Sequence, residues 1–376
     1  MKLIELDEFL KLFSKQTVPF TEFLNKAKVR LGSQLRPLKE YMKAKNIKMD
    51  DIKTLYENIQ DRNEYLTRFY NLSLSVRPAK LSEERAMKNK AFDNNAQSLY
   101  KNIIRNLHYL DILQNTKSGI ENNPTYMDML LELYKDYVID YKILTPSSLF
   151  YMNEGRLGSV FSSYYFRASI LNPYLIFSLN HSLLKGTRIF TPTLGWSSYS
   201  YGFLECPMVL EYVGTDVIPS VCQKTKELAK YVAPHKSVDI YCKPSEDLLK
   251  SPAFMTKYRE HFDVVFFSPP YYRLELYDSK QQSTDRYTTY EGWLAGYWER
   301  TIQLSQHVLQ KGGKLCYILS GYGSDNTKDQ YDLLGDMNAI TKKYFKLHSQ
   351  QPMYNKNVHV TKHRETGEQI MIFTKK

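Results

Sequence analysis

The sequence predicts an α/β fold in which a mostly parallel sheet ends in an antiparallel hairpin, preceded by an α-helical domain. From Thr187 onward, short β-branched and aromatic segments alternate with amphipathic helical segments, which is typical of a doubly wound parallel sheet with right-handed crossovers. Two later segments flank a turn-rich stretch at 362–367, which predicts the hairpin. The expected strands are 188–190, 209–213, 237–241, 264–267, 314–319, 345–351 and 369–374, and the expected helices between them are 220–232, 245–262 and 292–310.

Residues 1–145 are predicted to form the helical domain, and residues 146–376 the α/β domain. Apolar residues recur at helical spacing throughout the first part, and Ser82 followed by two glutamates resembles a helix start. This domain is either a nucleic-acid recognition domain or a scaffold for oligomerisation, and the sequence favours neither. The expected helices lie at 21–45, 50–70, 82–114 and 124–141, and a further helix at 163–184 is expected just before the first strand.

The composition indicates a folded protein with an anionic partner. The 376 residues are 43% hydrophobic and 14% aromatic, which is enough for a packed core. A net charge of +11 favours nucleic acid as the partner. The four cysteines show no metal-binding or disulfide spacing, so no metal site is expected. Without a signal peptide or an apolar run of 18 residues, the sequence predicts an intracellular, soluble protein with no membrane partner.

The strand at 264–267 runs into Ser268-Pro269-Pro270-Tyr271, a sequence that stops it abruptly. Neither proline can donate a hydrogen bond to a neighbouring strand, and Ser268 is forced into an extended conformation. The result is a stiff corner at the carboxyl end of a strand, where ligands bind in open α/β sheets. The corner offers a hydroxyl group, carbonyl acceptors and an aromatic ring.

Two further strand ends carry candidate ligand-binding residues. The loop after the first strand contains Gly195, Ser197 and Gly202, whose small size permits close approach of a cofactor to the backbone. Asp216 ends the second strand, 21 residues after Gly195, and is placed to accept hydrogen bonds from ribose hydroxyls. That spacing is typical of any adenosine-containing cofactor. The structural alternatives are a plain strand–turn–helix corner for the loop and helix capping for Asp216.

The corner sequence Ser268-Pro269-Pro270-Tyr271 resembles the catalytic motif of S-adenosylmethionine-dependent methyltransferases that modify nucleobase amino groups, N6 of adenine or N4 of cytosine. The loop 191–197 is similar to their Asp-Pro-x-x-Gly-Trp-Gly cofactor loop, with Thr191 in place of Asp and Ser197 in place of Gly. The resemblance covers about residues 150–376 and implies a Rossmann-like methyltransferase fold with a seven-stranded sheet. Losing the acid at 191 removes a partner for the ammonium group of the cofactor.

The resemblance also implies roles for individual residues. Ser268 and the carbonyl of Pro269 would accept hydrogen bonds from the target amine, while Tyr271 would stack on a flipped base. Glu246 and Asp247 would contact the adenine of the cofactor, although capping of a helix is equally expected. The segment 155–167 would help to hold the methionine end. The cofactor S-adenosyl-L-methionine is expected to bind Thr191, Pro192, Thr193, Gly195, Trp196, Ser197, Asp216, Val217, Glu246, Asp247 and Ser268.

A polar loop after the corner is expected to insert into nucleic acid or to act as a lid. Its cations suit phosphate contacts. The expected nucleic-acid-binding residues are Tyr272, Arg273, Lys280 and Arg286.

The favoured function is amino-methylation of a DNA base, and Ser268 leans towards cytosine N4. Three alternatives stay open: an RNA methyltransferase with the same corner, a catalytically degenerate nucleic-acid-binding subunit, and a nicotinamide-dependent oxidoreductase. The last is disfavoured by the corner and the terminal hairpin.

Overall fold

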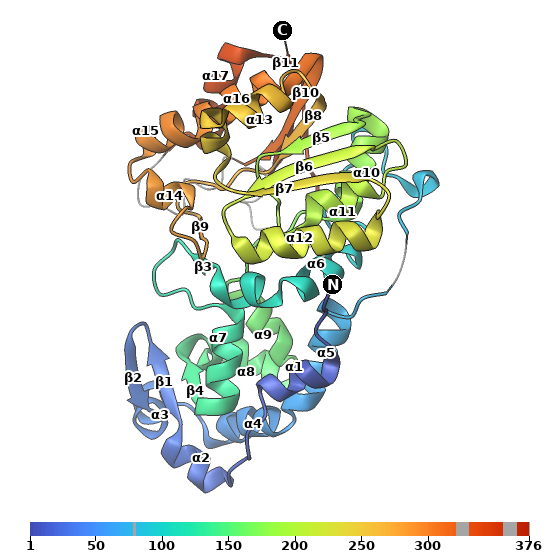
Figure 1. The fold of residues 1–376 in the computed structure, drawn as a ribbon. Helices are drawn as coiled ribbons and strands as arrows, with labels where there is room; N and C mark the ends of the chain where they lie inside the picture. Colours follow the sequence, from blue (N-terminus) through green and yellow to red (C-terminus); the bar gives the residue numbers. More distant parts are fainter. Residues whose placement is uncertain (78–79, 321–330, 356–366, 376) are drawn as a thin grey trace. The chain divides into compact units, whose positions relative to one another are not determined.

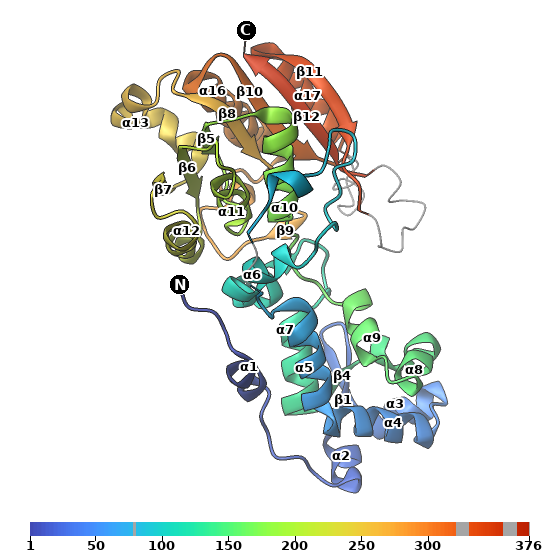
Figure 2. The same ribbon diagram turned by 90° about the vertical axis from the view of Figure 1, so that its right-hand side faces the viewer.

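The computed structural model describes residues 1–77, 80–320, 331–355 and 367–375. The chain divides into two compact units, each assembled from separate stretches (Figures 1 and 2). One contains Met1, Val76–His108 and Ser169–Lys376, and the other contains Lys2–Ser75 and Tyr109–Ala168. The expected boundary at 145/146 does not coincide with the division between these units, because Val76–His108 belongs to the first unit and Tyr109–Ala168 to the second. Whether residues 1–145 and 146–376 fold independently stays a prediction.

The first unit is built on a seven-stranded sheet in the order β11-β12-β10-β8-β5-β6-β7. Strand β12 runs antiparallel to both of its neighbours, and the central pairings are parallel. One antiparallel strand inserted at the end of a parallel sheet confirms the predicted Rossmann-like methyltransferase fold. The strands are β5 (Arg188–Thr191), β6 (Glu211–Asp216), β7 (Ser237–Cys242), β8 (Phe262–Phe267), β10 (Leu309–Leu319), β11 (Phe345–Pro352) and β12 (Gln369–Lys375).

All seven strands lie close to where the sequence predicts them, and the central ones are short apolar runs that are buried in the sheet. In β8, the side chains from Val264 to Phe267 are at most 1% exposed. Figure 1 shows α10 (Pro173–Leu179), α11 (Ser198–Leu204) and α12 (Pro219–Val232) on one face of the sheet. Helices α13 (Pro252–Lys257), α16 (Arg300–Val308) and α17 (Leu333–Tyr344) cover the other face. The turn-rich residues 362–366 lie outside the described residues.

Three helices expected in this unit are interrupted. The segment 163–184 is helical only to Tyr164 and is then non-helical up to Asn172. The Asn172 side chain caps α10 by accepting a hydrogen bond from the Tyr174 amide, and Pro173 opens that helix. Pro252 similarly separates a 3₁₀ helix, Ser245–Lys250, from α13. In the segment 292–310 the helix ends at Val308, two residues before the expected end, and β10 begins at Leu309. The remaining elements of this unit are the 3₁₀ helix Glu83–Arg85, α6 (Tyr100–Leu107), β9 (Glu275–Leu276), α14 (Ser283–Arg286), α15 (Tyr290–Trp293) and the π-helical turns Asn180–Leu184 and Leu294–Glu299.

The expected helix 82–114 is wrong between 86 and 99, where the chain is not helical, whereas Glu83–Arg85, Tyr100–Leu107 and the π-helical turn Asp111–Asn115 are helical.

The second unit is mainly helical, but it also contains a small sheet that the sequence analysis missed. The expected helix 21–45 is wrong at its centre. Strands β1 (Lys28–Leu31) and β2 (Gln34–Pro37) form a hairpin there, and β1 pairs in parallel with β4 (Val138–Asp140). Gly32 in the hairpin turn has a φ of 61°, a conformation that glycine adopts without strain.

The helices of this unit are α1 (Leu6–Leu12), α2 (Phe20–Lys26), α3 (Leu38–Lys45), α4 (Met49–Gln60), α5 (Arg62–Ser73), α7 (Tyr126–Leu131), α8 (Pro146–Asn153) and α9 (Leu157–Tyr164). Its other elements are β3 (Lys117–Ser118), the π-helical turns Asp111–Asn115 and Glu132–Asp136, and the 3₁₀ helix Tyr141–Leu144. No helix in the described ranges is long and apolar enough to cross a membrane.

Gly202 serves helix packing, because it lies inside α11 where that helix meets α10. A Cβ atom at this position would lie 2.6 Å from the carbonyl oxygen of Pro173 and 2.7 Å from Cβ of Ile176. Alanine is favoured over glycine in helices by about 1 kcal/mol, whereas overpacking costs about 1–3 kcal/mol. Because one of these contacts is with a backbone oxygen, which cannot rotate away, we take an overpacking cost of about 2–3 kcal/mol and expect Gly202→Ala to lower the free energy of unfolding by about 1–2 kcal/mol in urea titrations. Equal or higher stability would contradict the packing role.

Candidate cofactor and substrate site

The corner at Ser268 is held from beneath by Tyr199, a residue of α11. The amide of Ser268 donates a hydrogen bond to the Tyr199 hydroxyl at 3.1 Å, and that hydroxyl lies 3.3 Å from the Ser268 carbonyl oxygen as its donor. The Tyr199 ring meets Phe266 edge-on, with ring centroids 5.1 Å apart. Burial raises the pKa of Tyr199, so its hydroxyl stays protonated. The end of β8 and the first residue of the corner are thus fixed to α11, the helix after β5.

The Tyr271 ring is fixed from the neighbouring strand. Its hydroxyl accepts a hydrogen bond of 2.9 Å from the amide of Ser320, directly after the end of β10. Burial raises the pKa of Tyr271 well above its ordinary value, and the negative charge of Glu368 raises it further. Pro269, between the two anchored residues, is buried. The corner therefore has hydrogen bonds on both sides and does not depend on the prolines alone.

The loop after β5 has an unusual backbone. Gly195, Trp196 and Ser197 adopt left-handed conformations in succession, with φ of 51°, 57° and 68°. A Cβ on Gly195 would lie 2.2 Å from the Tyr199 ring, so the close approach requires glycine. The Ser197 hydroxyl, in turn, is 2.8 Å from Nε2 of His108 and 2.7 Å from the Thr225 hydroxyl.

These contacts hold Ser197 in a conformation that a side chain rarely adopts, and they explain why a serine suits this position. Just before it, Pro192 is buried, while Thr193 is half-buried beside Tyr199.

Thr191 is fully buried and engaged inside the sheet. Its hydroxyl lies 2.6 Å from the Tyr212 hydroxyl of β6. In register it faces Gly214, and a Cβ there would lie 2.8 Å from the Thr191 oxygen. Where the resembling family has an acid, this protein therefore has a threonine whose buried hydroxyl is hydrogen-bonded to the Tyr212 hydroxyl.

Asp216 joins the ends of β5 and β6. Its carboxylate accepts hydrogen bonds from the backbone amides of Leu194 at 3.0 Å, Val217 at 2.8 Å and Ile218 at 3.2 Å. Burial raises the pKa of Asp216, and these three donors oppose the rise. The carboxylate therefore shapes the cofactor loop, and its contact with a ribose stays a prediction.

Glu246 and Asp247 both pair with Arg286, and Asp247 also accepts a hydrogen bond of 2.9 Å from Lys250. The guanidinium donates to the Glu246 carboxylate at 2.8 Å and to the Asp247 carboxylate at 2.8 Å. The side chain of Glu246 is only 3% exposed. Burial raises the pKa of Glu246, and the charge of Arg286 opposes that rise. Arg286 is therefore engaged within the protein, so its expected contact with phosphate stays a prediction.

The other expected nucleic-acid-binding residues differ in exposure. Tyr272 is 5% exposed, and its hydroxyl donates to the Thr288 carbonyl at 2.8 Å. Its ring packs with Tyr290, Trp293 and Tyr331. Tyr272 therefore packs inside the loop, and its expected contact with nucleic acid stays a prediction.

Arg273 and Lys280, by contrast, are exposed. Arg273 lies over the Tyr272 ring and donates to the Thr288 carbonyl at 3.2 Å.

The polar loop after the corner runs across the ends of three strands. Tyr277 lies 5.9 Å from Trp196 between ring centroids, beyond β5. The Ser279 hydroxyl donates to the Val217 carbonyl at 3.1 Å, beyond β6. Arg286 then reaches the acids beyond β7. The loop is thus anchored beyond β5, β6 and β7, where three of the segments predicted to hold the cofactor lie.

Several functional residues were missed by sequence reasoning. Tyr199 and His108 act through contacts with Ser268 and Ser197 that are remote in sequence, and neither belongs to a spaced motif. Glu368 and Tyr297 lie far along the chain from the corner, and only the folded sheet brings Glu368 near Tyr271 and Tyr297 near Asp216. The segment 155–167 lies in the second unit, so its expected contact with the cofactor stays a prediction.

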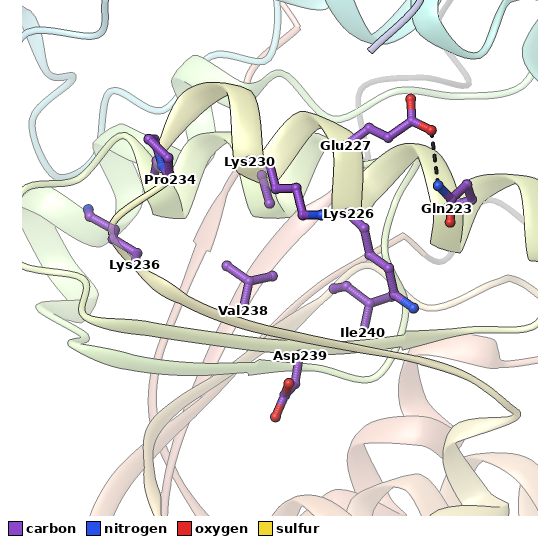
Figure 3. Close-up of a pocket in the computed structure, with 11 residues that line it drawn as sticks. Gln223, Lys226, Glu227, Lys230, Pro234, Lys236, Val238, Asp239 and Ile240 are labelled. Carbon is purple, nitrogen blue, oxygen red and sulfur yellow. Dashed lines mark hydrogen bonds between the residues drawn. The ribbon is translucent and has the colours of Figure 1, made fainter.

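A surface cavity of about 430 Å³ lies elsewhere on this unit, between α12 and the edge strand β7. Val238 and Ile240 point towards α12, while Asp239 points to the opposite side of the strand (Figure 3). The cavity is lined by residues of α12, the turn after it and β7, and none of them belongs to the expected site: Gln223, Lys226, Glu227, Ala229, Lys230, Ala233, Pro234, Lys236, Val238, Asp239 and Ile240.

No protein-family model matches the sequence, and no curated protein matches it. Among solved structures, the chain resembles N-methyltransferase NodS from Bradyrhizobium japonicum in complex with S-adenosyl-L-homocysteine. The identity is 13% and the TM-score 0.34, over 54% of this chain and 83% of that one. It also resembles TrmN from Thermus thermophilus, with 14% identity and a TM-score of 0.35, over 55% and 49%.

A third similar structure is the Methanococcus jannaschii fibrillarin pre-rRNA processing protein, with 11% identity and a TM-score of 0.32, over 50% of this chain and 66% of that one. At such identities and TM-scores these proteins carry no argument about substrate. The fold assignment rests on the strand order observed here.

Removing the Tyr199 hydroxyl tests the anchoring of the corner. In Tyr199→Phe the ring stays, but the buried Ser268 amide loses its acceptor, which costs about 1–3 kcal/mol. We expect that loss of unfolding free energy in urea titrations. Tyr201→Phe in the same helix is the matched control, because the structure records no hydrogen bond for its hydroxyl among the described residues. Equal effects of both substitutions would refute the anchoring role.

Arg286→Met tests the shared cation. It leaves the nearly buried Glu246 carboxylate without its partner, and breaking a buried pair in this way costs about 3–5 kcal/mol. The pKa of Glu246 is already raised and should rise further, and protonation relieves the cost. The stability difference from the unmodified protein should therefore be larger at pH 7.5 than at pH 5.

In Arg286→Met/Glu246→Gln the difference between these two pH values should shrink. A loss of stability that does not depend on pH would contradict this account.

Proposed function

We propose that the protein transfers a methyl group from S-adenosyl-L-methionine to the exocyclic amino group of a nucleobase, cytosine N4 or adenine N6, with DNA as the favoured substrate. The observation that carries the proposal is the double anchoring of the corner. The Ser268 amide is bonded to Tyr199, and the Tyr271 hydroxyl to the Ser320 amide. A corner fixed in this way presents its acceptors at the carboxyl edge of the sheet, next to the loop after β5.

The residues at this edge suit the proposed cofactor. The hydroxyls of Ser198 and Tyr297 are buried and lack hydrogen-bond partners within the described ranges. Tyr297 is also close enough to Asp216 and Glu246 for their charges to raise its pKa. Buried polar groups are normally hydrogen-bonded, so unsatisfied ones beside a strand-end site favour a polar ligand. Together with Trp196, Val217 and Asp247, these groups would hold the adenosine part of the cofactor.

The chemistry needs no covalent enzyme intermediate. The bound cofactor supplies an electrophilic methyl group on sulfur. The target nitrogen is a poor nucleophile because its lone pair is delocalised into the base. The Ser268 hydroxyl and the Pro269 carbonyl, as acceptors for its two hydrogens, favour a pyramidal nitrogen with an available lone pair. The nitrogen would gain the methyl group as the sulfur–methyl bond breaks, with S-adenosyl-L-homocysteine as the leaving group, and it would release one proton to solvent.

The Tyr271 ring, which is fixed through its hydroxyl, would stack on the base after it leaves the duplex.

The charges of the chain support an anionic polymer as the substrate. The net charge is +11, and the exposed Arg273 and Lys280 follow the corner directly. An RNA base is the second candidate, because a single-stranded substrate avoids the cost of unstacking.

A third candidate function is a degenerate binding subunit, and the observation that favours it is Thr191. Its buried pairing with Tyr212 leaves no acid at the usual place for the cofactor ammonium.

Mass spectrometry of nucleosides tests the proposal. Plasmid DNA and total RNA are incubated with the protein and with a cofactor that carries a deuterated methyl group. We expect labelled N4-methylcytosine or N6-methyladenine from DNA. Tyr271→Ala or Pro269→Ala should lower the yield by at least about 100-fold, a loss within the range reported for removing one transition-state contact, while cofactor affinity stays within about tenfold, or about 1.4 kcal/mol. Tyr201→Phe is the control and should retain activity.

Label in RNA alone would move the substrate to RNA, and cofactor binding without label in either polymer would favour the binding subunit. Full activity in both corner variants would refute the catalytic role of the corner.

A further inference from the structure

The position that usually carries an acid for the cofactor ammonium is closed in this protein. The hydroxyl of Thr191 is fully buried and lies 2.6 Å from the Tyr212 hydroxyl inside the sheet. An ammonium group brought to the end of β5 would meet no carboxylate from that position. If the edge of the sheet binds an amino-acid end, as the proposed function requires, another residue must supply the negative charge.

Glu275 contacts the segment just before α10 directly, and it is linked to the loop after β5 through Tyr277. One oxygen of its carboxylate accepts a hydrogen bond of 2.9 Å from the Ser169 amide, in the segment just before α10. The other oxygen accepts one of 3.0 Å from the Tyr277 hydroxyl. Tyr277 in turn contacts Trp196, with ring centroids 5.9 Å apart, in the left-handed loop after β5. The carboxylate is therefore one tyrosine away from the loop that would receive the cofactor.

The three acids predicted from the sequence to bind the cofactor are already engaged. Asp216 receives three backbone amides. Glu246 and Asp247 share the guanidinium of Arg286. Glu275, in contrast, forms no ion pair with any residue in the portion of the chain that the structure describes. Its two donors are neutral, and burial raises its pKa. A half-buried carboxylate without a cationic partner is destabilised by the water it has lost, and a cation arriving there would lower that cost.

We propose that Glu275 binds the ammonium group of the methionine end of the cofactor, in place of the acid missing at Thr191. This inference rests on the proposed function and deepens it, because it assigns the residue that receives the amino-acid end. The Ser169 amide and the Tyr277 hydroxyl would orient the carboxylate. The ammonium would add a charge-assisted hydrogen bond, which is stronger than the neutral ones already present.

Isothermal titration calorimetry with three ligands tests the proposal. S-adenosylmethionine and S-adenosylhomocysteine both carry the amino-acid end, whereas 5′-methylthioadenosine keeps the adenosine and lacks that end. We expect Glu275→Gln to weaken the first two ligands by about tenfold or more, since hydrogen bonds to charged groups contribute at this level. The affinity for 5′-methylthioadenosine should change by less than about twofold, which is under 0.5 kcal/mol.

The matched control is Glu205→Gln. Glu205 is another half-buried acid whose pKa is raised by burial, and it accepts a hydrogen bond from a backbone amide, that of Leu81 at 3.2 Å. This substitution should leave all three affinities unchanged. Glu275→Asp, which keeps the charge, should retain more affinity for S-adenosylhomocysteine than Glu275→Gln. Thermal unfolding without ligand shows whether each variant is folded.

Unchanged binding of S-adenosylhomocysteine by a folded Glu275→Gln variant would overturn the inference and leave the proposed function standing. An equal loss for all three ligands would also overturn it, because the adenosine would then be affected as much as the amino-acid end. If the unmodified protein binds none of the ligands, the proposed function and the inference both fail.

Discussion

The pair of hydrogen bonds between the Tyr199 hydroxyl and the backbone of Ser268 is the contact on which the geometry of the site depends. It joins the corner after β8 to the helix that follows β5, so the predicted substrate-binding residues are held next to the predicted cofactor loop. The same ring excludes any side chain at Gly195. One buried tyrosine therefore explains both the glycine of the loop and the position of the serine, and the interaction is local to the edge where parallel strands end.

Around this contact, the charged groups of the edge are placed differently from what a conventional cofactor loop would give. Thr191 has become part of a buried hydroxyl pair, Asp216 is occupied by backbone amides, and Arg286 neutralises the acids beyond β7. The loop after the corner supplies Glu275 and Arg286 and crosses the ends of β5, β6 and β7. The loop therefore holds the segments beyond these three strands together, and it also carries a carboxylate and a guanidinium to the edge of the sheet.

The sequence was most informative where burial dictates the pattern. The strands were predictable because a run such as 262–267 has no polar residue that solvent could reach except at its start, and the prolines at 269 and 270 mark its end. The hairpin at 28–37 was missed because its residues alternate with charges in a way that also fits a helix, and the Gly32–Ser33 turn was the overlooked signal. The roles of Tyr199 and His108 could not be predicted, since each depends on a contact between segments distant in sequence. Arg286 was assigned to phosphate because a lone cation in a polar loop gives no indication of a buried acid beside it.

The central claim is that an S-adenosyl cofactor binds at the carboxyl edge of the sheet beside Ser268. Amide hydrogen exchange measured by mass spectrometry, with and without saturating S-adenosylhomocysteine, tests this claim most directly. The account predicts slower exchange in peptides covering 191–199, 216–218, 268–272 and 275–286, with no change in the peptides of α12 and β7 that line the surface cavity. Protection confined to the cavity residues 223–240, or no protection anywhere, would contradict it.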